Sequence, residues 1–193
     1  ISHVADDLAA SLRALAVATD LDAVRGIEGE AARNYFAALN HLVRWEVREA
    51  FTLDGRTRRP PRDRFNALLS FIYALVRNAW RSALESVALD PQLGYLHAVR
   101  PGRAALALDL MEEFRAILAD RLALTLINRA QVNAKDFDER PGGAVYLHDD
   151  ARKTVVVAYQ ERKQEEVSHP LLETKVPIGL LPQLQARFLA RTI

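Results

Sequence analysis

Apolar residues recur along most of the chain at the three- and four-residue spacing of an α-helix. In residues 4–18 they stand at positions 4, 8, 12, 15 and 16, which predicts an amphipathic helix. Asp20 then has the position of an N-cap, with Ala23 as its N3 residue, and opens a second helical segment that runs to about Val43. Gly26 is expected to kink or divide this second helix, because glycine is a poor helix former.

Longer apolar helices follow in the middle of the chain. Residues 65–86 are apolar enough to predict a nearly buried helix at the centre of the fold. Residues 103–128 predict the longest helix, about 39 Å at 1.5 Å per residue. Between the early and central helices, residues 45–51 are expected to form helix or turn. A loop is expected over residues 54–61, whose Asp-Gly and Pro-Pro pairs are turn signals.

The pattern changes near the end of the long helix. Within residues 135–147 a Pro-Gly-Gly turn precedes Ala-Val-Tyr-Leu, which predicts a short strand or an extended hairpin arm. A further helix is expected from Asp149 or Asp150 to Val167, and a last one after Pro182. The prediction is therefore an all-α fold, with any β pairing confined to the small extended insertion near 135–147.

Composition narrows the class of protein. The chain has 193 residues, half of them hydrophobic, and no cysteine, which excludes a disulfide framework, a thiolate zinc site and a cysteine nucleophile. We expect a cytoplasmic protein without membrane association. No run approaches about 20 apolar residues, and Asp6 and Asp7 stand where a signal peptide would be basic. Because the chain starts with Ile1 and ends within a helical pattern, we expect residues 1–193 to be a single helical domain cut from a longer protein.

Charge leaves a nucleic-acid role open. The formal net charge is +1, from 26 Lys and Arg against 25 Asp and Glu, so the distribution of charge must decide. Only four of the basic residues are lysines; arginine suits phosphate recognition, although a GC-rich genome also favours it. Five arginines gather in one segment, namely Arg56, Arg58, Arg59, Arg62 and Arg64. They are candidates for phosphate contacts, and an ordinary solvated loop is the competing interpretation.

Glu28 is the first candidate for chemistry. It lies between Gly26 and Gly29, and each glycine inside a helix costs about 0.5–1 kcal/mol relative to alanine. Such a cost suggests that a ligand or another helix comes close to the carboxylate. The competing interpretation is a helix kink with a solvated glutamate.

His97 and an acidic stretch of the long helix are the other candidates. His97 precedes a helix break, where it could point across a cleft or serve only as a structural histidine. Asp109 shares a helix face with Glu112 and Glu113, and like charges at this spacing repel unless a cation relieves them. Arg115 offers a purely structural relief by pairing with Glu112. Two carboxylates and one imidazole from separate elements would suit Mn²⁺ or Mg²⁺, which can stabilise charge on a phosphoryl group.

Five segments between residues 26 and 115 form a recognisable series, namely residues 26–36, 66–75, 94–97, 100–103 and 108–115. In sequence and in order they resemble the signatures of the CRISPR-associated integrase family, metal-dependent DNA endonucleases that insert new spacers into a CRISPR array. Residues 160–163 and 185–187 also look familial.

The resemblance implies a helical catalytic domain with an assigned site. Mg²⁺ or Mn²⁺ would be held by Glu28, His97 and Glu112, with Asp109 as a supporting carboxylate behind these ligands. Arg100 would meet the scissile phosphate. The other DNA contacts would come from Arg56, Arg58, Arg59, Arg62 and Arg103.

The resemblance also implies a reaction and its partners. The 3′-hydroxyl of a spacer precursor would attack a phosphodiester at a repeat boundary, so the substrates would be double-stranded DNA. A homodimer and a small ferredoxin-like companion subunit are expected. The family's N-terminal β-rich domain and extreme C-terminus are missing from these residues, which leaves dimerisation by this chain alone open. Two other functions stay possible: a non-catalytic helical DNA-binding module and a helical interaction scaffold without a nucleic-acid role.

Overall fold

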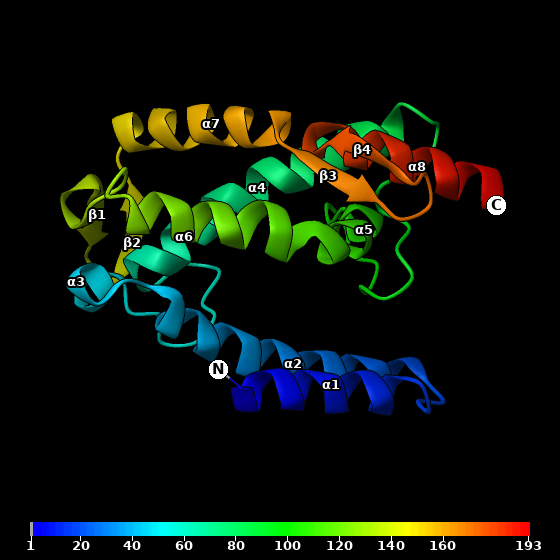
Figure 1. The fold of residues 1–193 in the computed structure, drawn as a ribbon, viewed down its shortest axis with the longest axis horizontal. Coiled ribbons are helices and arrows are strands. Elements are labelled where there is room, and N and C mark those ends of the chain that lie inside the picture. Colours follow the sequence, from blue (N-terminus) through cyan, green and yellow to red (C-terminus); the bar gives the residue numbers. More distant parts are fainter. Residues whose placement is uncertain (1) are drawn as a thin grey trace. The chain divides into compact units, whose positions relative to one another are not determined.

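Helices make up most of the described chain, residues 2–193 of the computed structural model, and β pairing there is limited to two short hairpins (Figure 1). The all-α prediction is confirmed. The chain divides into two compact units. Unit 1 comprises the residues up to Leu68 together with Ile127–His148, and unit 2 comprises Leu69–Leu126 together with Asp149–Ile193. None of the helices described is both long enough and apolar enough to cross a membrane.

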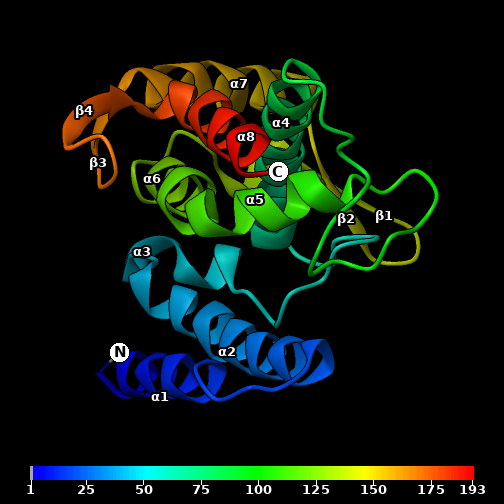
Figure 2. The same ribbon diagram turned by 90° about the vertical axis from the view of Figure 1, so that its right-hand side faces the viewer.

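Unit 1 begins with an antiparallel helical hairpin of α1 (Ser2–Leu15) and α2 (Leu21–Leu42), seen side by side in Figures 1 and 2. Asp20 caps α2 as predicted, since its side chain accepts a hydrogen bond of 2.8 Å from the backbone N–H of Ala23. The prediction that Gly26 divides this helix is wrong. Its cost of about 0.5–1 kcal/mol is small enough for the cap and the packing against α1 to outweigh.

The rest of unit 1 combines short helices with the first hairpin. Phe137 pairs with Leu147, and Arg140 pairs with Ala144, which confirms the predicted insertion as an antiparallel hairpin. The rings of Phe51 and Phe137 meet edge to face, with centroids 5.8 Å apart. The elements are α3 (Trp45–Arg48), η1 (Glu49–Phe51), η3 (Ala134–Asp136), β1 (Phe137–Arg140) and β2 (Ala144–Leu147).

Helix α4 (Arg64–Glu85) confirms the predicted central helix in its bounds and its burial. Its first turn belongs to unit 1 and the remainder to unit 2. Asp63 caps it, because the Asp63 carboxylate accepts a hydrogen bond of 2.7 Å from the N–H of Asn66. One face of the helix is fully buried at every turn: Phe65, Leu68, Leu69, Ile72, Val76, Trp80 and Leu84 are all 0% exposed.

The predicted long helix over residues 103–128 begins two residues later, at Ala105, and is then helical to Asn128 but changes its winding. Helix α5 (Ala105–Arg115) passes into the π-helix η2 (Ala116–Asp120) and then into α6 (Arg121–Asn128). A π-turn disturbs the regular hydrogen-bond ladder, and here Arg162 compensates, since its Nη2 donates to the carbonyl oxygen of Ile117 at 3.0 Å.

A second hairpin in unit 2 corrects the prediction for the C-terminal region. β3 (Glu166–His169) and β4 (Thr174–Pro177) pair antiparallel, so β structure is not confined to residues 135–147, and the preceding helix α7 (Asp149–Gln164) ends before Val167. His169 and Val176 are buried at 2% and 8% exposure and anchor the two strands. The hairpin projects beyond α7 and α8 in Figure 2 and leads through η4 (Ile178–Leu180) into α8 (Leu181–Thr192).

Candidate functional site

Asp109 on α5 holds the loop that carries His97. Its Oδ2 accepts hydrogen bonds from the backbone N–H groups of Tyr95, at 2.6 Å, and Leu96, at 3.0 Å. Its Oδ1 accepts the backbone N–H of His97 at 2.9 Å and lies 2.6 Å from the His97 Nδ1 atom. Three consecutive N–H groups that converge on one anion form a backbone nest. The loop is therefore folded around the Asp109 carboxylate.

This environment keeps Asp109 charged and sets the ring of His97. Burial alone would raise the pKa of the Asp109 carboxyl, but hydrogen bonds from His97, Leu96 and Tyr95 outweigh it and hold the pKa below its ordinary value. A charged carboxylate only accepts hydrogen bonds, so Nδ1 of His97 is the protonated nitrogen. In the neutral ring, Nε2 is then the nitrogen with the lone pair that can bind a cation. The two side chains are 11% and 14% exposed.

Glu112 is held from the same helix. Its Oε2 lies 2.5 Å from Nη1 of Arg115, and these side chains are 25% and 13% exposed. The guanidinium of Arg115 also lies over the ring of Tyr73, 5.5 Å from its centroid. The structural ion pair that competes with a metal role for Glu112 is thus present.

Glu28 lies on α2 in unit 1 and is partly exposed. We expected Gly26 and Gly29 to admit a close helix or a ligand. Within the described part of unit 1, a Cβ at either glycine would meet no atom within 4 Å. Within that unit, the space beside these two glycines is therefore open.

The donors predicted for a metal are distributed over both units. Unit 2 brings His97 and Asp109 together and carries Glu112 one turn further along α5, whereas Glu28 belongs to unit 1. Within the described residues of either unit, no three His, Asp or Glu side chains gather to hold a cation. The donor chemistry nevertheless suits Mn²⁺ or Mg²⁺. A histidine whose other ring nitrogen donates to a carboxylate has the arrangement typical of metal ligands.

The arginine cluster separates into two kinds of side chain. Arg56 is internal: its Nη1 donates to the Thr57 carbonyl at 2.6 Å and to Asn66 Oδ1 at 2.7 Å. Arg62 donates to the Gly142 carbonyl at 2.7 Å. These two predicted DNA contacts therefore have structural roles already.

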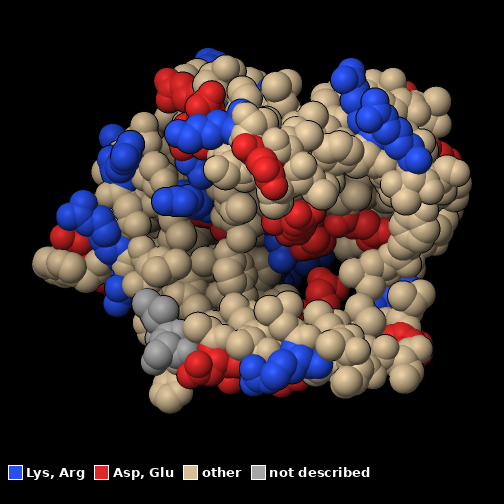
Figure 3. Space-filling view, turned by 45° about the vertical axis from the view of Figure 1, so that its right-hand side comes forward, with Lys and Arg blue, Asp and Glu red and all other residues tan. Residues whose placement is uncertain are grey.

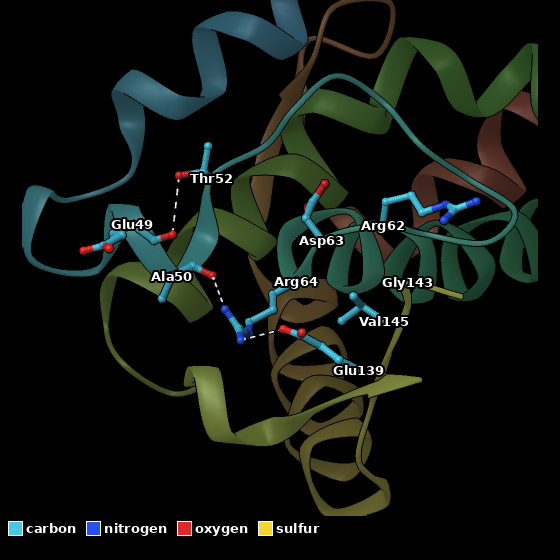
Figure 4. Close-up of a pocket in the computed structure, with 9 residues that line it drawn as sticks. All are labelled: Glu49, Ala50, Thr52, Arg62, Asp63, Arg64, Glu139, Gly143 and Val145. Carbon is cyan, nitrogen blue, oxygen red and sulfur yellow. Dashed lines mark hydrogen bonds and ion pairs between the residues drawn. The ribbon is translucent and has the colours of Figure 1, made fainter. Parts of the chain in front are cut away.

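Arg64 joins η1 to the first hairpin. Its Nη1 donates to the Ala50 carbonyl at 3.2 Å, and its Nη2 pairs with Glu139 at 2.7 Å (Figure 4). The pair borders a polar cavity of about 210 Å³ with acidic and basic side chains on its wall. The cavity is lined by Glu49, Ala50, Thr52, Arg62, Asp63, Arg64, Glu139, Gly143 and Val145.

The remaining predicted DNA contacts lie on the surface of their own unit. Arg58 and Arg59 are exposed, as is Arg100, and Arg103 is partly exposed. The N–H of Arg103 donates to the carbonyl of Arg100 at 3.0 Å, so both belong to one tight turn after His97. On the face drawn in Figure 3, basic side chains form small groups among acidic and neutral ones.

One buried polar pair was not predicted. Asp120, at the end of the π-helix, is 1% exposed and accepts a hydrogen bond from the hydroxyl of Tyr73. Its only sequence signal is a single acid that directly follows the apolar residues 116–119. A buried carboxylate of this kind needs partners, and the helix α4 supplies one.

Comparison with known families agrees with this architecture. The family model of CRISPR associated protein Cas1 matches residues 1–161. A CRISPR-associated endonuclease Cas1 from Moorella thermoacetica is 62% identical over 193 residues, covering 100% of this chain and 56% of that protein. Another, from Chlorobaculum tepidum, is 54% identical over 186 residues, covering 96% of this chain and 54% of that protein. The chain thus spans about half the length of these relatives.

Solved structures show the same fold. A CAS1 protein from Thermotoga maritima superposes with a TM-score of 0.86 at 33% identity, over 97% of this chain and 56% of that one. A casposase bound to integration product gives a TM-score of 0.83 at 25% identity, over 94% of this chain and 50% of that one. With a family match over most of its length and such close relatives, this chain belongs to the Cas1 family of CRISPR-associated proteins.

Proposed function

We propose that this chain is the catalytic region of a metal-dependent DNA endonuclease and integrase. In the proposed reaction, the 3′-hydroxyl of a spacer DNA attacks a phosphodiester at a CRISPR repeat boundary, so that a new phosphodiester joins the spacer to the repeat and the cleaved strand leaves with a 3′-hydroxyl. Glu28, His97 and Glu112 would hold Mg²⁺ or Mn²⁺. The observation that carries the proposal is the His97–Asp109 pair, in which Nδ1 is engaged at 2.6 Å and Nε2 is left for a cation.

Each side chain has a separate task in this proposal. A divalent cation, when bound, stabilises charge on phosphoryl oxygens and activates a bound hydroxyl. Asp109 fixes the ring of His97, and Arg115 orients the carboxylate of Glu112. Glu28 contributes the second carboxylate. Arg100, exposed on the turn after His97, neutralises charge that develops on the phosphate.

The proposed partners are based on the complexes in which similar structures occur. A structure similar to this chain, with a TM-score of 0.84 at 29% identity, is a Cas6-RT-Cas1–Cas2 complex, and the casposase is bound to integration product. For this chain we propose double-stranded DNA substrates, both spacer precursor and CRISPR repeat. We also propose a homodimer and a small ferredoxin-like companion subunit.

Single substitutions of the three ligands test the proposed chemistry. Glu28→Ala, His97→Ala and Glu112→Ala should each reduce Mn²⁺-dependent cleavage of branched DNA by about 100-fold or more, while DNA affinity is kept. Glu30→Ala and Glu113→Ala are matched controls, because both are exposed glutamates on the same helices. They should leave cleavage unchanged.

Other outcomes identify the other functions. If the three ligand variants cleave like the wild type, or if the wild type binds branched DNA without cleaving it, the chain is a non-catalytic DNA-binding module. If the wild type does not bind branched DNA, or binds it with an affinity that salt does not weaken, the chain is an interaction scaffold.

A further inference from the structure

Gly94 occupies a position where no side chain fits. An ideal Cβ there would lie 2.7 Å from Cβ of Ala105, 2.7 Å from Oδ2 of Asp109 and 2.8 Å from the backbone carbon of Ala105. Such distances are far below van der Waals contact. Ala105 is 0% exposed and begins α5, so its backbone cannot move aside without displacing the helix.

The close approach at Gly94 comes directly before the nest around Asp109. The next three residues, Tyr95, Leu96 and His97, are the ones whose N–H groups donate to the Asp109 carboxylate. The start of this loop is also tied to α5, since the N–H of Leu106 donates to the Pro91 carbonyl at 2.9 Å. The loop therefore lies flat against the first turn of α5, and the missing Cβ is what permits it.

We propose that Gly94 is a positioning residue for His97. The absence of a side chain at Gly94 brings the loop close enough to α5 for Asp109 to bind three consecutive N–H groups together with Nδ1 of His97. This contact selects the ring tautomer with the proton on Nδ1 and aims Nε2 away from Asp109. The inference rests on the proposed function for the role of His97 as a metal ligand, whereas the tautomer can be tested without it.

Nitrogen-15 NMR of the histidine rings in the full chain, with Mn²⁺ titration monitored separately, tests the proposal. In the wild type, His97 should show the tautomer protonated on Nδ1. Gly94→Ala and Asp109→Asn should both lose this signature and bind Mn²⁺ about 10- to 100-fold more weakly. Tyr95→Ala is the matched control, because its side chain is 64% exposed and its backbone N–H is retained. It should change neither measurement.

The double variant Gly94→Ala/Asp109→Asn shows whether the two residues act together. If Gly94 acts through Asp109, the double variant should have the same Mn²⁺ affinity as whichever single variant has the lower one. The proposal is overturned if the two fold-losses of Mn²⁺ affinity multiply in the double variant. It is also overturned if Gly94→Ala keeps the wild-type tautomer of His97 and the wild-type Mn²⁺ affinity.

Amide hydrogen exchange in the wild type tests the nest even where a variant does not fold. The amides of Tyr95, Leu96 and His97 should exchange slowly in the wild type, and fast exchange there would contradict the nest. Their exchange should be faster in Gly94→Ala and Asp109→Asn wherever these variants fold. If the wild type binds no Mn²⁺, the proposed function fails. The ring tautomer and the amide protection still decide the role of Gly94 in that case.

Discussion

Arg115 lies one helical turn after Glu112 on α5, and its Nη1 atom is 2.5 Å from Oε2 of Glu112, with both side chains largely buried. Removing the guanidinium leaves the carboxylate without this partner in a partly desolvated place. Arg115→Ala should therefore lower the free energy of unfolding by about 1–3 kcal/mol, measured by urea denaturation. Arg121→Ala, an exposed arginine on the adjoining α6, should change it by less than about 0.5 kcal/mol. Equal effects of the two substitutions would show that the pair contributes nothing specific.

Asp63 should make stability depend on pH. Burial raises the pKa of its carboxyl above the ordinary 3.8, although hydrogen bonds from Asn66 and the charge of Arg56 oppose the rise. The folded state then binds the proton more tightly than the unfolded state, so the carboxyl's contribution is greatest below the unfolded pKa. It is lost as pH rises through the folded pKa.

Asp63→Asn removes this titration while it can keep the cap, because the amide oxygen can still accept the N–H of Asn66. As pH rises from below 3.8 towards neutrality, the free energy of unfolding of the variant should improve relative to the wild type. Urea denaturation at several pH values measures the difference, and Asp20→Asn on the exposed cap of α2 controls for the loss of a carboxylate. A constant difference across this range contradicts the effect of burial.

The arginine cluster should separate into DNA-binding and structural members. Arg58→Ala/Arg59→Ala removes two exposed charges, so it should weaken binding of unrelated branched DNAs about equally. The slope of log affinity against log salt should flatten by roughly 0.9 for each phosphate that the variant no longer neutralises. Stability should not change. If affinity and slope are unchanged, the phosphate contacts lie elsewhere, and Arg100 and Arg103 are the next candidates.

Arg64→Ala should behave in the opposite way. It breaks the ion pair with Glu139 and the hydrogen bond to the Ala50 carbonyl, which fasten the first hairpin to η1. Thermal denaturation should show a lower melting temperature. Glu139→Gln should share much of this destabilisation, since it removes the charge of the same pair. Wild-type stability in both variants would return Arg64 to the set of candidate phosphate contacts.

The features that the sequence predicts well are those set by residues close together in the chain. The bounds of α4 follow from its continuous apolar spacing, and the cap at Asp20 follows from the preference of aspartate for that position. The second hairpin was missed because residues 166–177 contain two prolines and many polar residues, a composition that predicts a loop between helices. Its strands are fixed instead by burial of His169 and Val176, a tertiary effect that spacing does not reveal.

The candidate site was predictable in composition but not in its contacts. The acidic spacing on α5 and the family resemblance single out Asp109 and Glu112, and repulsion between like charges was the reason offered. Within unit 2, that repulsion is relieved by protein groups: backbone N–H groups of the His97 loop around Asp109, and Arg115 beside Glu112. Backbone donors have no sequence signature, so only the structure could show them.

Trp80 supplies a prediction about the core. Its side chain is 0% exposed and stacks on Phe114 with ring centroids 5.3 Å apart, while its indole N–H meets no acceptor within the described chain. Trp80→Phe keeps an aromatic ring and removes the unpaired donor. The free energy of unfolding should stay within about 1 kcal/mol of the wild type.

Trp80→Ala removes the stacking as well and should cost about 3–5 kcal/mol in urea denaturation. A destabilisation of that size for Trp80→Phe would instead show that the lost volume of the indole, or a partner of its nitrogen such as an ordered water, outweighs the removal of the unpaired donor.

The division of the chain into two units also constrains the order in which it can fold. Unit 1 needs both the residues up to Leu68 and Ile127–His148, so its first hairpin is synthesised only after Leu69–Leu126. Unit 2 in turn waits for Asp149–Ile193. Neither unit is complete when the first half of the chain has been synthesised, but unit 1 has all its residues at His148 and can therefore close before unit 2. Both must close long segments of chain late in synthesis, and folding should be slower than for a helical protein whose contacts are local.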